Sequence, residues 1–151
     1  MNVTEATSED LTTRKVEIRE SSNGFVPPKY VYQLVFRMLA TVPPKYFNGL
    51  GCVVLTNQSG APRRWRLGKV SSRKRRVPQE RVLARYHQKH DGKPAWVELY
   101  VDKLVTAISY HPWVPMGRTA VFAHVLFREL SHHVHTALRP EFREKEDVAD
   151  D

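Results

Sequence analysis

Four ionisable side chains occur within six positions of a strongly apolar segment, residues 120–137, and they are the residues best placed to do chemistry. They are Arg128, Glu129, His132 and His133. At about 100° per residue, the large apolar residues of this segment cover more than half of the circumference of a helix, which is typical of a helix inside a domain. Glu129 and His133 are expected within this apolar arc, and Arg128 and His132 along its edge. Since a buried charged or polar side chain must be paired, hydrogen-bonded or bound to metal, the segment predicts a site.

The sequence RELSHH, followed by EKEDVAD, resembles the HELGHH…ExxAD arrangement of small single-domain zinc metallopeptidases with a glutamate third ligand. In such enzymes two histidines four residues apart share one zinc ion, and the glutamate after the first histidine is the general base for the zinc-bound water. The resemblance implies that Glu129 is the base, His132 the second histidine ligand and Glu146 the third ligand. It also implies a peptide or protein substrate for an active member.

The first histidine of the motif is replaced by Arg128, whose guanidinium stays protonated and offers no lone pair to a metal. His135 is three residues from His132, so a rearranged zinc site of His132, His135 and Glu146 is an alternative. In that arrangement neither the water nor Glu129 is placed as the mechanism requires. The motif therefore predicts a metallopeptidase-like protein with a degenerate zinc site, either a non-catalytic relative or a weak hydrolase, with zinc as its cofactor only if the site has been rebuilt.

Two interpretations of Arg128 remain open. In the first, its permanent charge takes the place of the zinc and pairs with Glu146, Glu129 or both, because a guanidinium can bind a carboxylate through two hydrogen bonds. In the second, the side chain extends from the edge of the helix into water. The first predicts a close contact with a carboxylate, and the second predicts an exposed guanidinium.

A second function class is suggested by residues 63–85, which contain ten Lys and Arg residues and one acid, in a chain of net charge +8. Such a basic block attracts phosphates or acidic partners, and an interleaved tryptophan can stack on a base. The alternative function is therefore a binding module for nucleic acid or an acidic protein, although a solvated hairpin rich in Lys and Arg explains the same pattern. The candidate binding residues are Arg63, Arg64, Trp65, Arg66, Arg73, Lys74, Arg75 and Arg76.

The elements that must position these residues follow from the apolar periodicity and the turn signals. Strands are expected at residues 15–19, 52–56, 81–87 and 95–100, with residues 64–69 as the hairpin partner of 52–56. Helices are expected at residues 30–40 and 101–109, with a loop at residues 111–117 before the long helix. The sequence AWVELY at residues 95–100 resembles the edge strand of the metallopeptidase sheet, which can pair with substrate backbone. These elements predict an α+β fold, a small antiparallel sheet packed on helices, zincin-like with the motif helix at its centre.

Length and composition bound these predictions. The 151 residues suit one domain, residues 14–151, after a polar N-terminal tail at residues 1–13. No run approaches the roughly 18 apolar residues of a membrane span, and we expect no membrane association. The single cysteine, Cys52, cannot form an internal disulfide, so a reducing cytoplasm is the expected location. Cys52 stands in an apolar run and is expected to be a buried structural thiol.

Overall fold

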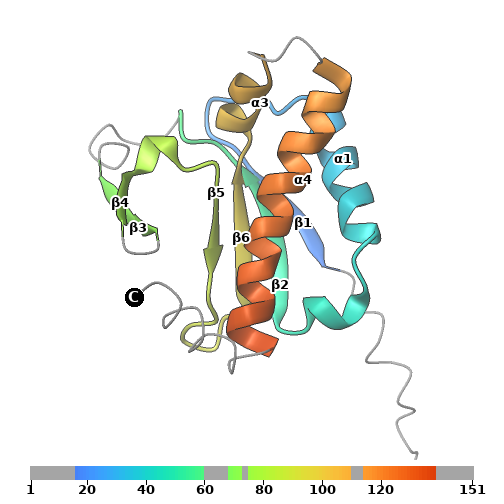
Figure 1. Ribbon diagram of the computed structural model, residues 1–151, viewed down its shortest axis with the longest axis vertical. Coiled ribbons are helices and arrows are strands. Elements are labelled where there is room, and N and C mark those ends of the chain that lie inside the picture. Colours follow the sequence, from blue (N-terminus) through green and yellow to red (C-terminus); the bar gives the residue numbers. More distant parts are fainter. Residues whose placement is uncertain (1–15, 60–67, 73–74, 110–113, 139–151) are drawn as a thin grey trace, which may run out of the picture.

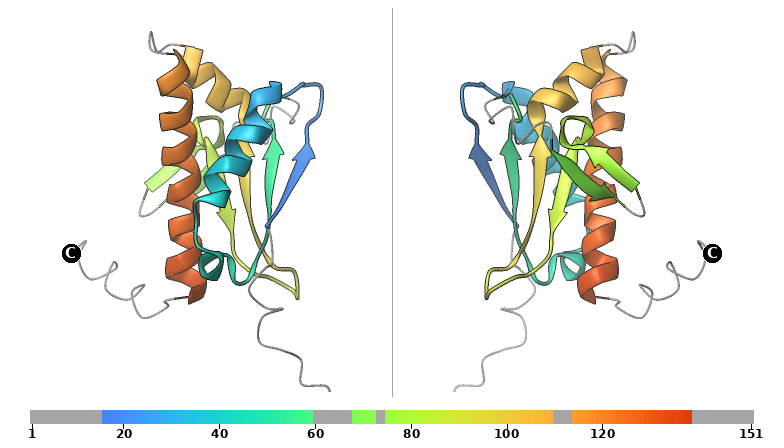
Figure 2. Two further views of the ribbon diagram at one scale, coloured as in Figure 1. Left: turned by 90° about the vertical axis from the view of Figure 1, so that its right-hand side faces the viewer. Right: turned by 90° about the vertical axis from the view of Figure 1, so that its left-hand side faces the viewer.

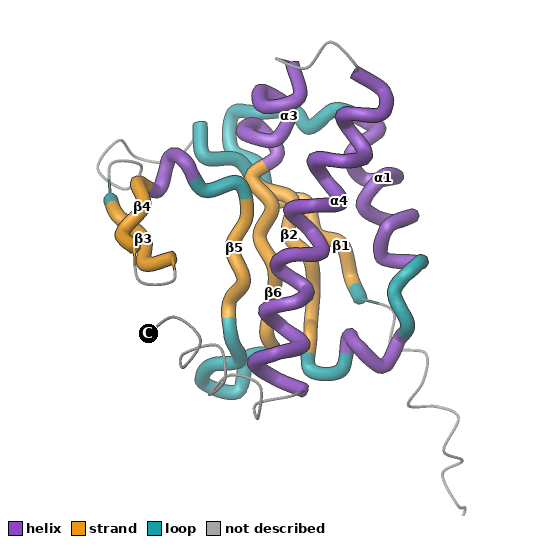
Figure 3. Tube along the Cα trace, in the orientation of Figure 1, coloured by secondary structure: helices purple, strands orange, loops and turns teal. Residues whose placement is uncertain are grey.

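The computed structural model describes residues 16–59, 68–72, 75–109 and 114–138, and the predicted tail at residues 1–13 lies outside them. One mixed sheet has the strand order β1-β2-β6-β5, and a smaller sheet pairs β3 with β4 (Figure 1, Figure 3). The strands are β1 Glu17–Ser21, β2 Leu50–Thr56, β3 Lys69–Ser72, β4 Arg75–Pro78, β5 Ala84–His87 and β6 Ala95–Tyr100. The helices and helical turns are α1 Lys29–Ala40, η1 Pro44–Phe47, η2 Gln79–Arg81, α3 Val101–Ser109, α4 Val114–His133 and η3 Val134–Leu138. The predicted α+β class, a sheet packed on helices, is confirmed.

The prediction of an antiparallel sheet is wrong in its pairing. Strands β1, β2 and β6 run parallel to one another, and only β5 is antiparallel to its neighbour β6. The physical reason is the length of the connections. The helix α1 carries the chain back between β1 and β2, which produces a parallel pair, whereas the short turn at Asp91 and Gly92 joins β5 to β6 and can only produce an antiparallel one.

Two further predictions about the sheet are corrected by the strand order. The hairpin between residues 52–56 and 64–69 is wrong, because β2 already pairs with β1 on one side and β6 on the other. Lys69 instead begins β3, which pairs with β4, and residues 64–67 lie outside the described part. The assignment of residues 95–100 as an edge strand is also wrong, since β6 lies between β2 and β5. In the four-stranded sheet the edges are β1 and β5.

The helices α1 and α4 pack on the same face of the four-stranded sheet, and α3 packs against α4 near one end of it (Figure 2). The core between these layers is formed by apolar side chains that alternate along β2 and β6 and recur along the helices. Its fully buried members include Val31, Val35, Val53, Leu55, Val97, Leu99, Val101, Leu104, Phe122 and Leu126. The alternate residues of the strands, among them Thr56, Trp96 and Glu98, lie on the opposite face, which α1 and α4 leave open (Figure 2).

The local elements agree with the sequence in most places. The bounds of β6 and α3 match the predicted ranges, and α1 begins directly after Pro27 and Pro28. The predicted loop at residues 111–117 is wrong from Val114 onward, where α4 starts. Its Pro115 is accommodated because the N–H groups of the first helical turn have no acceptor within the helix. Cys52 is buried, as predicted. None of the described helices is long and apolar enough to cross a membrane.

Candidate functional site

The four ionisable residues of α4 divide into a buried pair and an outer pair. Glu129 is 5% exposed and His133 is fully buried, whereas Arg128 is exposed and His132 is partly exposed. Residues four apart lie on the same side of a helix, so each pair occupies one side of α4. The predicted placement of Glu129 and His133 within the apolar arc is confirmed.

His133 is held by hydrogen bonds on both ring nitrogens. Its Nε2–H donates to the carbonyl oxygen of Asn48 at 3.0 Å, and its Nδ1 accepts the hydroxyl proton of Tyr86 at 3.1 Å. The Tyr86 ring meets the imidazole edge to face, with centroids 5.6 Å apart. Burial lowers the pKa of His133, although the bond to Asn48 opposes this, and burial also raises the pKa of Tyr86. His133 is therefore a neutral imidazole that joins α4 to β5 and to the turn before β2, with no lone pair available for a metal.

Arg128 extends from α4 with half of its side chain exposed. Its Nη1 lies 4.0 Å from Oε1 of Glu129, whose side chain is 7% exposed. This distance is at the outer limit of an ion pair, and the guanidinium faces water, so the contact contributes little to stability. The exposure agrees with the interpretation in which Arg128 extends into water. Its predicted contact with Glu146 lies outside the described residues.

The rearranged zinc site was expected to use His132, His135 and Glu146. Within the described part of the chain, no three His, Cys, Asp or Glu side chains are grouped so that they could share a metal ion, and Glu146 lies outside that part. The spacing from His132 to His135 crosses the junction of α4 with η3, which is a π-helix. Since a π-helix bonds residues five apart, the α-helical spacing used for the prediction does not hold there. The described residues thus do not fit a zinc ion on their own.

Two hollows lie beside the last turns of α4. A cleft of about 450 Å³ lies between β5 and η3, and both hydrogen-bond partners of His133, Tyr86 and Asn48, line it. A second, mainly apolar hollow of about 490 Å³ is formed by α4, η3 and the region of η1, with Tyr46, Phe127 and His135 among its lining residues. The end of α4 that carries the motif is therefore accessible on both flanks, while His133 itself is sealed.

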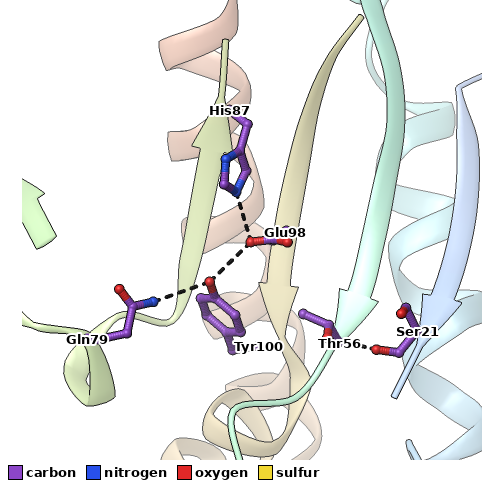
Figure 4. Close-up of polar contacts among 6 residues, drawn as sticks. All are labelled: Ser21, Thr56, Gln79, His87, Glu98 and Tyr100. Atoms are coloured by element: carbon purple, nitrogen blue, oxygen red, sulfur yellow. Dashed lines mark hydrogen bonds and ion pairs between the residues drawn. The ribbon is translucent and has the colours of Figure 1, made fainter. Parts of the chain in front are cut away.

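A second polar cluster lies on the open face of the sheet (Figure 4). His87 Nε2–H donates to Oε2 of Glu98 at 2.8 Å, and the Tyr100 hydroxyl donates to the same oxygen at 3.2 Å. The Gln79 side-chain amide donates to the Tyr100 hydroxyl at 3.3 Å. The imidazole of His87 stacks on the Trp96 indole, with centroids 4.4 Å apart. The strands β5 and β6 and the turn η2 thus converge on one carboxylate.

The surroundings of Glu98 determine its charge. Burial alone would raise its pKa, but the hydrogen bond and charge of His87, the hydrogen bond from Tyr100 and the charge of Arg85 together lower it. Burial and the neighbouring carboxylate raise the pKa of Tyr100, which keeps its hydroxyl protonated as a donor. Glu98 is therefore an ionised acceptor at neutral pH, with its side chain 28% exposed and that of His87 22% exposed.

The contact between His87 and Glu98 was not predicted from the sequence. The sequence predicts a strand at residues 95–100 but no side-chain partner for Trp96, Glu98 or Tyr100 within it. The turn at Asp91 and Gly92 could have indicated this contact, because strands paired outward from the turn place His87 opposite Trp96 and therefore close to Glu98. The distant partner Gln79 had no such signal. Its turn is held by the fully buried Gln58, whose amide donates to the carbonyl oxygens of Gln79 and Val82.

The basic segment is described only in part. Strands β3 and β4 pair with each other, and Arg75 and Arg76 lie on β4 opposite Ser72 and Ser71. The other candidate binding residues lie outside the described residues: Arg63, Arg64, Trp65, Arg66, Arg73 and Lys74.

No family model matches the sequence, and no curated protein or solved structure is significantly similar to it.

Proposed function

We propose that the chain is a metallopeptidase-like domain with a degenerate zinc site, a non-catalytic relative of the small zinc metallopeptidases. One observation carries this proposal. On α4 the base position is occupied by the buried Glu129, while the first ligand position is occupied by Arg128, whose half-exposed guanidinium lies 4.0 Å from that carboxylate.

The chemistry of Arg128 supports loss of catalysis. A zinc ion binds a water molecule and lowers its pKa, which a guanidinium cannot do because it has no vacant coordination position and no lone pair. The guanidinium does place a positive charge 4.0 Å from Glu129, where the metal's charge would stand in an active relative, although at this distance and exposure the pair is weak. The neighbouring His133 offers no replacement ligand, because Tyr86 and Asn48 engage both of its ring nitrogens.

Zinc binding by the purified chain tests the proposal, beside Arg128→His and the matched control Arg128→Gln, which removes the charge without adding a ligand. We expect no stoichiometric zinc in the native chain or in Arg128→Gln. We expect one zinc per chain in Arg128→His, lost again when His132→Ala or Glu146→Ala is added.

Two results would contradict the proposal in different ways. Stoichiometric zinc in the native chain that disappears with His132→Ala would mean that the site has been rebuilt and that peptidase activity must be assayed. If no variant bound zinc while circular dichroism showed intact folding, the proposed relation to zinc metallopeptidases would itself be contradicted.

A second candidate function, nucleic-acid binding, is favoured by the position of the β3–β4 hairpin. Among the described strands its two members pair only with each other, and the hairpin stands beside β5, apart from the four-stranded sheet (Figure 1). For about four contacted phosphates, the affinity for mixed-sequence single-stranded DNA should fall roughly 50-fold between about 50 and 200 mM salt. Salt-insensitive binding, or binding to acidic protein alone, would count against it.

A further inference from the structure

A pocket between α1 and α4 lies away from the motif residues. The two helices run side by side and begin at the same end of the domain (Figure 1, Figure 2). The pocket has a volume of about 210 Å³. Its lining residues are Tyr30, Gln33, Leu34 and Arg37 from α1 and Arg118 and Thr119 from α4. This volume is below the roughly 300–1,000 Å³ of pockets for drug-sized ligands, so it suits a small group.

Arg118 is the best-positioned donor in this pocket. Its guanidinium lies over the ring of Tyr30, 4.5 Å from the centroid, which fixes the orientation of the planar group. Its Nε–H is buried and has no hydrogen-bond acceptor among the described residues. Buried donors in folded proteins are nearly always paired, so this N–H is a donor without a partner, and a small rotation of the Arg118 side chain would present it to an acceptor in the pocket.

The charged residues that line the pocket indicate that this acceptor is an anion. Arg37 and Arg118 supply one guanidinium from each helix, and neither forms an ion pair with another described residue. Gln33 and Thr119 add neutral donors, and no Asp or Glu lines the pocket. Two guanidinium groups with neutral donors around a small volume match an oxyanion with several acceptor oxygens and two negative charges.

We propose that this pocket binds the phosphate group of a small anionic ligand. The Nε–H and one Nη–H of Arg118 form a fork that binds two phosphate oxygens, with the Tyr30 ring behind it as a support. Arg37 closes the exposed side from α1. The site is independent of α4's motif end and of any metal.

Inorganic phosphate is the probe for the test, titrated at constant ionic strength against chloride and followed by the arginine Nε–H signals in nitrogen-15 NMR. We expect one Nε–H signal, absent from Arg118→Lys, to shift saturably, and the unfolding temperature to rise with phosphate. The variant Arg118→Lys keeps the charge but loses the fork, and we expect it to bind about tenfold more weakly. We expect a similar loss for Arg37→Gln, whose exposed side chain makes unfolding a minor concern.

The matched control is Arg19→Gln on β1, which removes the same charge from the open face of the sheet and should leave phosphate affinity unchanged. Equal affinity in the native chain and in Arg118→Lys would overturn the proposal, as would a shift that never saturates. Acetate competing as well as phosphate would overturn the assignment to a dianion. Zinc content plays no part in these readouts, so the result stands apart from the metal experiment.

Discussion

Tyr86 and His87 are neighbours on β5, and their side chains lie on opposite faces of the sheet. Tyr86 faces the helices and donates its hydroxyl proton to the fully buried His133. His87 lies on the open face and donates to the carboxylate of Glu98. One strand thus contributes to two histidine clusters that differ in their partners and in their exposure.

The partners decide what each histidine can do. His133 lies between a hydroxyl and a backbone carbonyl, both neutral, and burial holds it in the uncharged form. His87 lies beside an ionised carboxylate and retains contact with water, since 22% of its side chain is exposed. The histidine near the end of α4 therefore joins elements of the fold, while the accessible acid–base groups lie on the face of the sheet without helices.

The largest expected effect comes from removing the buried histidine. We expect His133→Ala to lower the free energy of unfolding by about 3 kcal/mol, because it leaves a cavity and two unpaired partners, Tyr86 and Asn48. For His87→Ala we expect about 1 kcal/mol, because water can replace its contacts. Urea denaturation of both variants measures the difference. Equal losses would contradict the difference in burial between the two histidines. Tyr86→Phe, with an expected intermediate loss of about 1–2 kcal/mol, would show how much one hydrogen bond contributes.

The next largest effect is expected on the stability of the fold as the pH is lowered. Because burial lowers the pKa of His133 in the folded protein, the unfolded chain binds this proton at higher pH. Stability from His133 is therefore fully present above its ordinary pKa of about 6.5 and is lost as pH falls through the lower, folded value. The pKa of Glu98 is also lowered, so its contribution is lost only below the ordinary carboxyl range, near 4.5.

The two histidine clusters should thus respond in separate pH windows, each with a slope of at most about 1.4 kcal/mol per pH unit. Urea unfolding measured from about pH 7.5 down to about pH 2.5 covers both windows and tests this. The variant His133→Gln should remove the upper window and leave the lower one, and Glu98→Gln should do the reverse. A native chain whose pH dependence is unchanged by His133→Gln would contradict the buried, neutral state of that histidine.

Local features of the fold were predictable because they depend on near neighbours in the sequence. The bounds of α3 and β6 and the burial of Cys52 follow from apolar periodicity, and so does the division of α4, with Glu129 and His133 inside. The parallel pairing was not predictable in this way. It depends on how the crossover through α1 and the long connection between β2 and β6 order the strands, and strand patterns alone do not record that order.

In the candidate site, too, the features that depend on near neighbours in the sequence were predictable and the long-range contacts were not. The spacing of ionisable residues on one apolar segment predicts which side chains of α4 are candidates, but the partners of His133 are 47 and 85 residues away in the chain. Such contacts arise only when the strands and helices are packed, and nothing in RELSHH indicates them. The zinc site with His135 stays a prediction, because Glu146 lies outside the described residues, but the α-helical spacing on which it rests crosses into a segment that forms a π-helix.

The smallest effect is expected on the open face of the sheet, at Glu98. We expect Glu98→Gln to lower the free energy of unfolding by about 1 kcal/mol or less, because the amide oxygen still accepts from Tyr100 while the charge beside His87 is lost. The matched control is Glu17→Gln on β1, whose ion pair with Arg19 lies on the same face and is more than half exposed. Urea denaturation should show no change for this control, because water screens the pair. If Glu17→Gln were as destabilising as Glu98→Gln, partial burial would not explain the strength of the His87–Glu98 pair. The difference between His87 and His133 would then depend on their hydrogen-bond partners and not on their exposure.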